Sequence, residues 1–306
     1  MTATLRIRGS LRQITGTLVM GVVNASPESF SDAGQYATLE DRIALAERLV
    51  ADGADVIDVG GQSAITNQPE LDAALEIERV LPIVDWLHRR HPDVLISVDT
   101  YKPPVVAAVL AAGADLINDV SGLRYPEVAA QAGAAGAALV VMHTRAGPKV
   151  RLQDPARYDD VLADVVGFLA EGMARAVAAG MPREGIVLDP GPDFAKTPPQ
   201  TLTVLRGLAE VRALGRPLLL ALSRKDFLGA ILAKPPRGRD AGSLAALALL
   251  GSTGGNIARV HDVAASVDVV RTVEHLMGRQ ELSEAYLLPD ELRHERDAAV
   301  GSAPAT

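Results

Sequence analysis

One pattern recurs along most of this chain: a short apolar run, rich in β-branched residues, ends in a small or polar residue and precedes a longer stretch of helical periodicity. The predicted strands are 17–24, 55–60, 94–99, 115–119, 138–143, 185–190, 217–222 and 256–261. The predicted helices are 40–52, 70–90, 103–112, 126–134, 158–179, 200–214, 241–251 and 264–277. Eight strands that alternate with eight helices over about 260 residues predict an α/β fold, a single (β/α)₈ TIM barrel.

The competing architecture is a doubly wound open sheet, which normally carries a G-x-G-x-x-G motif after its first strand. No such motif follows 17–24, and the strands are continuously apolar, as expected when both faces are buried. No Gly/Ser linker divides the chain. We therefore expect an N-terminal extension over 1–16, one barrel domain over 17–280 and a frayed C-terminal tail over 281–306.

The composition excludes several classes of function. The 306 residues include no cysteine, which excludes disulfides and thiolate zinc sites. A net charge of −8 and only 3% aromatic residues argue against a nucleic-acid surface. No apolar run approaches the ~18 residues of a membrane span, and Met1–Arg6 does not resemble a signal peptide. We expect a cytoplasmic enzyme that acts on small molecules and binds neither nucleic acid nor membranes.

Polar side chains gather where the predicted strands end. They are Asn24, Asp58, Asp99, Asn118, Asp119, His143, Asp189, Ser223, Arg224, Lys225, Arg259 and His261. The carboxyl ends of barrel strands converge on one face, which carries the active site in barrel enzymes. A helix cap explains an Asp, Asn or Ser at any single strand end. It does not explain acids and amides on the earlier strands together with cations on the last two.

The acids and amides of this ring match a flat nitrogen heterocycle. Asp99, Asn118 and Asp189 supply acceptors and an amide from different strand ends. A pterin or a guanine presents the complementary edge, which consists of adjacent ring N–H, amino and carbonyl groups. The sequence therefore predicts a heterocycle pocket at the carboxyl face of the barrel.

The cations of the ring indicate that the ligand carries an anionic group. Lys225, Arg259 and His261 bring positive charge to the last two strand ends, which suits a phosphate or a pyrophosphate. Asn24 ends the first strand, which neighbours the last strand in a closed barrel, and its amide oxygen is a possible Mg²⁺ ligand. We therefore expect a magnesium ion on the anion.

Other interpretations have less support. His143 and His261 lack a third ligand at a supporting spacing, so a catalytic zinc is not expected. Ser63 with His143 would need a G-x-S-x-G elbow for a hydrolase triad, and the chain has none. The basic run 234–239 contains two prolines and is interpreted as a solvated loop.

Seven ordered motifs carry a family resemblance. They are Met-Gly-Val-Val-Asn-Ala-Ser-Pro-Glu-Ser-Phe-Ser-Asp at 20–32, Asp-Val-Ile-Asp-Val-Gly-Gly at 55–61, Ile-Ser-Val-Asp-Thr at 96–100, Ile-Asn-Asp-Val-Ser-Gly at 117–122, Leu-Asp-Pro-Gly at 188–191, Ser-Arg-Lys at 223–225 and Arg-Val-His-Asp-Val at 259–263. In this order they resemble the motifs of the dihydropteroate synthase family. That family is a TIM barrel that joins 6-hydroxymethyl-7,8-dihydropterin pyrophosphate to p-aminobenzoate and releases pyrophosphate.

The resemblance implies a role for each site residue. Asp99, Asn118 and Asp189 are expected to hold the pterin, and Lys225 to contact it. Met142, Phe194 and Ser223 are expected to bind substrate, with Phe194 near the aminobenzoate. Arg259 and His261 are expected to bind the pyrophosphate, and Asn24 the Mg²⁺. Of these, the expected catalytic residues are Lys225, Arg259 and His261. The family also implies a homodimer.

Two segments depart from the family pattern. The second loop usually runs Gly-Gly-Glu-Ser-Thr-Arg-Pro-Gly, and here Ala64 and Ile65 replace the threonine and the arginine that help to hold the anion. After the sixth strand the usual Phe-Gly-Phe-Gly-Lys is Pro-Asp-Phe-Ala-Lys, which places Asp193 beside Phe194. The pterin half of the pattern is intact, whereas the loop and second-substrate half is altered.

These departures leave alternatives to a synthase that uses p-aminobenzoate. The chain is alternatively a synthase with a different arylamine acceptor, or a weakly active or non-catalytic paralogue that still binds pterins. A methyltransferase acting on methyl-tetrahydrofolate shares a similar pterin-holding barrel. It is disfavoured because the Ser-Arg-Lys and Arg-Val-His motifs serve a pyrophosphate, which that substrate lacks, and because the chain has no cobalamin-binding segment.

Overall fold

The computed structural model describes residues 2–25, 38–62 and 69–294, and eight parallel strands close into a barrel. The barrel strands are β3 (Thr17–Asn24), β4 (Val56–Gly60), β5 (Leu95–Asp99), β6 (Leu116–Asp119), β7 (Ala138–Met142), β8 (Ile186–Asp189), β9 (Leu218–Leu220) and β10 (Asn256–Val260). Each pairs with the next along the chain, and β10 closes the ring on β3 with Arg259 opposite Met20. The predicted (β/α)₈ barrel is confirmed.

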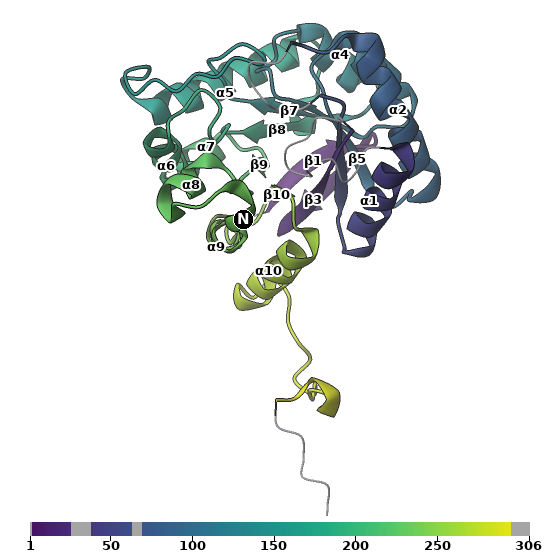
Figure 1. Ribbon diagram of the computed structural model, residues 1–306, viewed down its shortest axis with the longest axis vertical. Helices are drawn as coiled ribbons and strands as arrows, with labels where there is room; N and C mark the ends of the chain where they lie inside the picture. The colour runs from purple at the N-terminus through teal and green to yellow at the C-terminus, as the bar shows by residue number, and fades with distance from the viewer. Residues whose placement is uncertain (1, 26–37, 63–68, 295–306) are drawn as a thin grey trace, which may run out of the picture.

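The helices surround the strands (Figure 1). They are α1 (Leu39–Ala51), α2 (Ala73–Arg90), α3 (Pro103–Ala111), α4 (Pro126–Ala134), α5 (Val161–Ala178), α6 (Pro198–Arg206), α7 (Leu208–Arg212), α8 (Asp226–Leu232), α9 (Asp240–Gly251) and α10 (Val263–Leu276). Short 3₁₀ turns occur at Arg183–Gly185, Pro236–Gly238 and Asp290–Leu292. Among the described residues, no helix is both long and apolar enough to cross a membrane.

Two helical predictions needed correction. The single helix predicted over 200–214 is interrupted at Gly207, where a Cβ atom would lie 2.2 Å from a methyl carbon of Leu162. α8 was not predicted, because its seven residues are too few for a helical period to be visible in the sequence. It begins directly after Lys225 and therefore lies beside the predicted site.

The core has two layers. Inside the barrel, inward side chains such as Met20, Val56 and Ile257 form one buried cluster. Between strands and helices, the outward side chains pack with the apolar faces of the helices in a larger cluster. Both faces of each strand are therefore buried, which explains the continuous apolar runs in the sequence.

The N-terminal extension contains an antiparallel hairpin that the sequence analysis missed. β1 (Ala3–Ile7) and β2 (Ser10–Ile14) are joined at Arg8 and Gly9, both of which have positive φ. A tight primed turn of this kind is usually signalled by Asn-Gly or Asp-Gly, which is absent here. Leu5, Ile7 and Ile14 join the inner core cluster, and in Figure 1 β1 lies against the middle of the barrel. The hairpin thereby covers apolar residues inside the barrel.

Candidate active site

The carboxyl ends of the strands border a cavity of about 450 Å³. The residues predicted for the site that line it are Asp99, Asn118, Met142, Asp189, Phe194, Lys225 and Arg259. Strand ends and the segments that follow β7, β8 and β9 supply most of the wall. A cavity of this size matches the range typical of small-molecule sites.

An arginine lies between two carboxylates at the mouth of the barrel. The Arg259 Nε donates to Asp58 Oδ2 at 2.7 Å, and Nη2 donates to Asp99 Oδ2 at 3.2 Å. Asp58 is fully buried, whereas Asp99 and Arg259 keep about a fifth of their side chains exposed. Burial raises the pKa of Asp99 to about 7, and Arg259 opposes that shift. The sequence analysis noted Asp58 at a strand end but assigned it no partner.

The amide nitrogen of the Asn118 side chain has a hydrogen-bond partner in the described structure, whereas its amide oxygen has none. Its Nδ2 donates to Asp58 Oδ2 at 3.3 Å, and the residue is 1% exposed. Within the described chain, its Oδ1 is buried without a hydrogen-bond partner. Leaving a buried acceptor unpaired costs about 1–3 kcal/mol. Because Asn118 lines the cavity, an N–H group of a bound ligand is the natural partner for this oxygen.

Asp189 completes the acidic side of the cavity. It ends β8, is 2% exposed, and its Oδ1 accepts from the backbone N–H of Gly191 at 2.7 Å. Burial raises its pKa, which the Gly191 hydrogen bond and the nearby Lys225 oppose. Gly191 has φ +63°, and a Cβ atom there would lie 2.1 Å from the carbonyl oxygen of His143. The turn that fixes Asp189 therefore requires glycine.

A cation and an aromatic ring also line the cavity. The Lys225 Nζ lies 4.4 Å from the centroid of the Phe194 ring, a cation–π distance. Burial lowers the pKa of Lys225, and the charges of Asp193 and Asp189 act against that shift. Both residues line the cavity. The wall thus offers an apolar ring beside a cation.

Asn24, Ser223 and His261 lie apart from this group. Among the described residues they are not part of the cavity lining, although Asn24 ends β3 and His261 directly follows β10. His261 Nδ1 lies 2.9 Å from Ser223 Oγ, which links the loops after β9 and β10. The segments 26–37 and 63–68, which include Ala64 and Ile65, lie outside the described residues.

A magnesium site made of protein carboxylates is absent from the described residues. They contain no group of three or more His, Cys, Asp or Glu side chains arranged to hold a metal. Asn24 offers a single amide oxygen at a half-buried strand end. That donor fits Mg²⁺ only as one ligand of an ion whose other ligands are water and substrate phosphate oxygens, which is how Mg²⁺ is commonly bound.

A buried lysine is the main residue that the sequence analysis missed. Lys196 is 0% exposed, and its Nζ donates to the carbonyl oxygens of Gly191 and Phe194 at 2.9 and 3.1 Å. The same Nζ lies 2.7 Å from His143 Nδ1, while His143 Nε2 lies 2.9 Å from Asp164 Oδ2. Burial lowers the pKa of His143 to about 3 and that of Lys196 to about 7. With both ring nitrogens of His143 engaged, neither the zinc nor the triad interpretation is supported.

The basic run 234–239 also needed correction. Residues 234–238 are exposed as predicted, but Arg239 is only 9% exposed. Its Nη1 donates to the carbonyl oxygens of Arg224 and Lys225 at 2.9 and 3.0 Å. A basic residue in a proline-containing run usually faces solvent, and only the fold reveals that this one supports the loop that carries Lys225.

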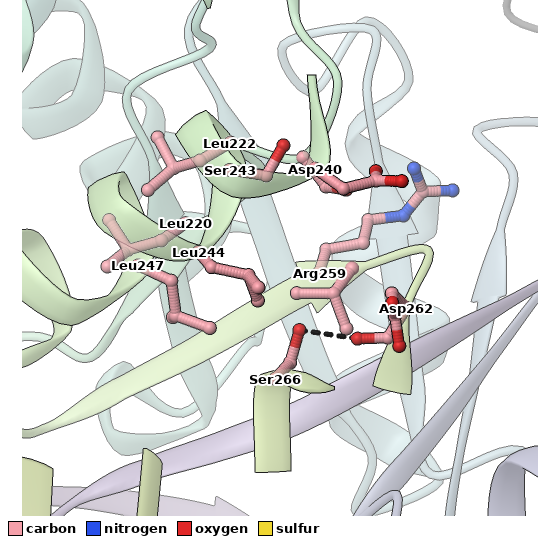
Figure 2. Close-up of a pocket in the computed structure, with 11 residues that line it drawn as sticks. Leu220, Leu222, Asp240, Ser243, Leu244, Leu247, Arg259, Asp262 and Ser266 are labelled. Carbon is pink, nitrogen blue, oxygen red and sulfur yellow. Dashed lines mark hydrogen bonds between the residues drawn. The ribbon is translucent and has the colours of Figure 1, made fainter. Parts of the chain in front are cut away.

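A second cavity lies between β9, β10, α9 and α10. Figure 2 shows leucines 220, 244 and 247 on one side of it, with the guanidinium group of Arg259 pointing away from them. Its volume is about 10 Å³, roughly the space of a single water molecule. It is a packing gap rather than a substrate site.

Comparisons with known proteins agree with this geometry. The profile of the pterin binding enzyme family matches residues 20–261. The dihydropteroate synthase of Escherichia coli K12 is 36% identical over 274 residues, covering 90% of this chain and 96% of the relative.

Two solved structures are similar over most of the chain. A Yersinia pestis dihydropteroate synthase with a sulfonamide drug complex superposes with a TM-score of 0.84 at 36% identity, covering 90% of this chain and 99% of the other. A Burkholderia cenocepacia dihydropteroate synthase complexed with 7,8-dihydropteroate gives a TM-score of 0.80 at 36% identity, covering 90% and 97%.

Proposed function

Because the chain belongs to the dihydropteroate synthase family of pterin-binding enzymes, we propose that its cavity carries out the condensation of that family with the side chains described above. The reaction joins 6-hydroxymethyl-7,8-dihydropterin pyrophosphate to p-aminobenzoate, and it gives 7,8-dihydropteroate and pyrophosphate. The chain is accordingly a transferase of folate biosynthesis. The single observation that carries the assignment of residues is the unpaired, buried Asn118 Oδ1 among cavity-lining carboxylates.

The pterin ring is held by the strand ends. Asp99 and Asp189 accept hydrogen bonds from its amino and ring N–H groups, and Asn118 Oδ1 accepts one more. These groups stand on barrel strands and are buried or nearly so, which fixes their positions before the substrate arrives. Lys225 approaches from the loop after β9 and donates to the acceptor atoms of the ring.

The pyrophosphate leaves from the methylene group next to the ring. The C–O bond breaks as its electron pair passes to the departing pyrophosphate, and the ring nitrogens share the positive charge left on the methylene carbon. Arg259 and His261 supply positive charge for the leaving group. When bound at Asn24, Mg²⁺ would offset the charge that grows on the phosphate oxygens. The amine of p-aminobenzoate attacks the same carbon, with Phe194 and Lys225 bordering its side of the cavity, and then loses a proton.

A pyrophosphate-release assay tests the proposal. Purified protein with the dihydropterin pyrophosphate should release pyrophosphate in a manner that requires p-aminobenzoate, and the product should be 7,8-dihydropteroate by mass. Chelation with EDTA should weaken binding of the pyrophosphate substrate but not of 6-hydroxymethyl-7,8-dihydropterin, which lacks the anion. Tight pterin binding without pyrophosphate release would support the non-catalytic paralogue instead.

The identity of the arylamine substrate is the part of the proposed function that the departures from the family pattern concern. Asp193 beside Phe194, together with Ala64 and Ile65 in the second loop, motivates a synthase with another arylamine as the second candidate. A panel of substituted anilines in the same assay separates the two candidates by kcat/KM. A homodimer and a cytoplasmic location are further proposals that rest on the family resemblance, and sedimentation analysis tests the first.

A further inference from the structure

The loop after β8 and the loop after β9 are joined by one carboxylate. Asp193 Oδ2 accepts from the backbone N–H of Asp226 at 2.6 Å and from that of Phe227 at 3.4 Å. Asp226 and Phe227 are the first two residues of α8. The carboxylate of one loop therefore caps a helix that starts in the other loop.

The residue at the N-cap position of α8 does not perform this task. The N-cap position of α8 is Lys225, whose side chain has no acceptor atom and makes no capping hydrogen bond. The first N–H groups of a helix have no partner within the helix and need an acceptor from elsewhere. Asp193 supplies that acceptor from a residue 33 positions away in the chain.

The other side of Asp193 is anchored to α6. Its backbone N–H donates to Thr201 Oγ1 at 3.1 Å, and the same hydroxyl donates to Asp193 Oδ1 at 3.1 Å. Thr201 is fully buried. Asp193 adopts φ +64°, a left-handed conformation that aspartate tolerates better than most residues. The side chain is therefore held between a fixed hydroxyl and the start of α8.

Phe194 and Lys225, which line the cavity where the arylamine is proposed to bind, are the sequence neighbours of the residues in these contacts. Phe194 follows Asp193, and Lys225 precedes Asp226, so the hydrogen bond between Asp193 and Asp226 joins the two backbone segments that carry the Phe194 ring and the Lys225 Nζ. Burial lowers the pKa of Lys225, and the negative charge of Asp193 acts against that shift and favours the protonated lysine. One side chain thus both borders the lysine through the backbone of Asp226 and favours its charge, and it makes no hydrogen bond with the pterin-side acids or Asn118 in the described structure.

We propose that Asp193 is a positioning residue, which holds the loops after β8 and β9 together and thereby sets the Phe194–Lys225 wall that receives the acceptor amine. This inference rests on the proposed function for the identity of the acceptor. The arrangement of Phe194 and Lys225 does not depend on that function, so it can be tested separately.

The test compares Asp193→Gly, which keeps the positive φ but removes the carboxylate, with Asp193→Asn, which keeps an acceptor for the α8 N–H groups. Asp160→Gly is the matched control, because Asp160 Oδ1 also accepts from two helix N–H groups, those of Leu162 and Ala163, outside the cavity lining. All three proteins are compared by thermal unfolding, by steady-state kinetics with p-aminobenzoate and by calorimetry with the dihydropterin pyrophosphate.

Asp193→Gly should raise the KM for p-aminobenzoate about tenfold, whereas the pterin Kd should rise no more than about threefold, because Asp99, Asn118 and Asp189 still hold the ring when Lys225 shifts. The KM of Asp193→Asn should be close to the wild-type value. Asp160→Gly should lower the unfolding temperature by a similar amount to Asp193→Gly but leave the KM unchanged. Equal KM values for Asp193→Gly and wild type would overturn the proposal, as would an equal rise of KM in Asp160→Gly.

A second measurement keeps the proposal testable if the protein does not turn over. Acetic anhydride labels lysines according to their exposure and neutral fraction, and mass spectrometry reports the yield at Lys225 without any substrate. Asp193→Gly should label Lys225 several times faster than wild type, and Asp160→Gly should not. If the wild type shows no turnover but Lys225 labels faster in Asp193→Gly, the result counts against the proposed function alone. If Lys225 labels at the same rate in Asp193→Gly and the wild type, the result counts against the role of Asp193.

Discussion

The two halves of the cavity are built differently. On the proposed pterin side, Asp99, Asn118 and Asp189 stand on three barrel strands, and the ladder of parallel strands fixes their spacing. On the acceptor side, Phe194 and Lys225 stand on loops, and side-chain contacts such as those of Asp193 hold them in place. The strand ladder fixes the positions of the groups on strands, so only substitution of the residue itself alters them. Groups on loops also move when a supporting contact is lost. The acceptor side is therefore where a barrel of this kind can change substrate.

The largest expected effect lies on the strand-borne side. Asp99→Ala should weaken binding of the dihydropterin pyrophosphate about 10- to 100-fold, since a hydrogen bond to a charged group contributes about 1.5–3 kcal/mol. Asp93→Ala, an exposed acid that precedes the same strand, is the control and should bind as wild type does. Calorimetry gives both affinities, and circular dichroism checks that the barrel is retained. An unchanged Kd in Asp99→Ala would remove this residue from the pterin site.

A smaller effect is expected in the second loop. Restoring the family residues with Ala64→Thr and Ile65→Arg should raise kcat with p-aminobenzoate up to about tenfold, because a loop arginine would act on the charge of the departing pyrophosphate. The pterin Kd should change by less than twofold.

Steady-state kinetics of the double variant and the wild type, with p-aminobenzoate and with other anilines, checks this expectation. A better acceptor in the wild type, together with no gain in the double variant, would show that the loop serves acceptor choice. No gain with any acceptor would contradict the argument from the loop.

The smallest effect concerns the buried lysine that supports the acceptor side. Burial lowers the pKa of Lys196 to about 7, below the value near 10.5 of an unfolded lysine. Between these two values the unfolded chain binds more protons, so this group makes the free energy of unfolding rise with pH from about 7 to about 10. Lys196→Met should remove that contribution.

Urea unfolding of both proteins at pH 7.5 and pH 9 measures the contribution as a difference of differences, so that other titrating groups cancel. The wild type should gain more stability over this interval than Lys196→Met. Equal gains in the two proteins would mean that Lys196 keeps an ordinary pKa despite its burial.

The difference between groups on strands and groups on loops also explains which features could be predicted from the sequence. The barrel, the order of its strands and the polar residues at their ends follow from a repeated apolar pattern and from the convergence of parallel strands. The sequence therefore predicts that Asp99, Asn118 and Asp189 lie close together, and all three line the cavity. Residue patterns alone indicate only that the ligand is a heterocycle with an anionic group. The family resemblance added the reaction.

The residues that were missed act through contacts that no local pattern records. Burial lowers the pKa of Lys196, and the carbonyl oxygens that accept its hydrogen bonds face it only after the chain has turned at Gly191. Arg239 supports the Lys225 loop from a run that resembles a solvated segment. α8 is too short for its period to be visible, and its cap lies on another loop. Only the folded chain brings such long-range partners of single polar groups together.

If Asp99, Asn118 and Asp189 hold the pterin from the barrel strands, pterin binding should largely survive a displacement of the loop-borne acceptor side. Calorimetric titration of dihydropterin pyrophosphate into wild type, Asp189→Ala and Asp193→Gly tests it most directly. Affinity should fall about 10- to 100-fold in Asp189→Ala and no more than about threefold in Asp193→Gly, although the two residues are only four positions apart. Similar losses in both variants, or none in Asp189→Ala, would contradict it.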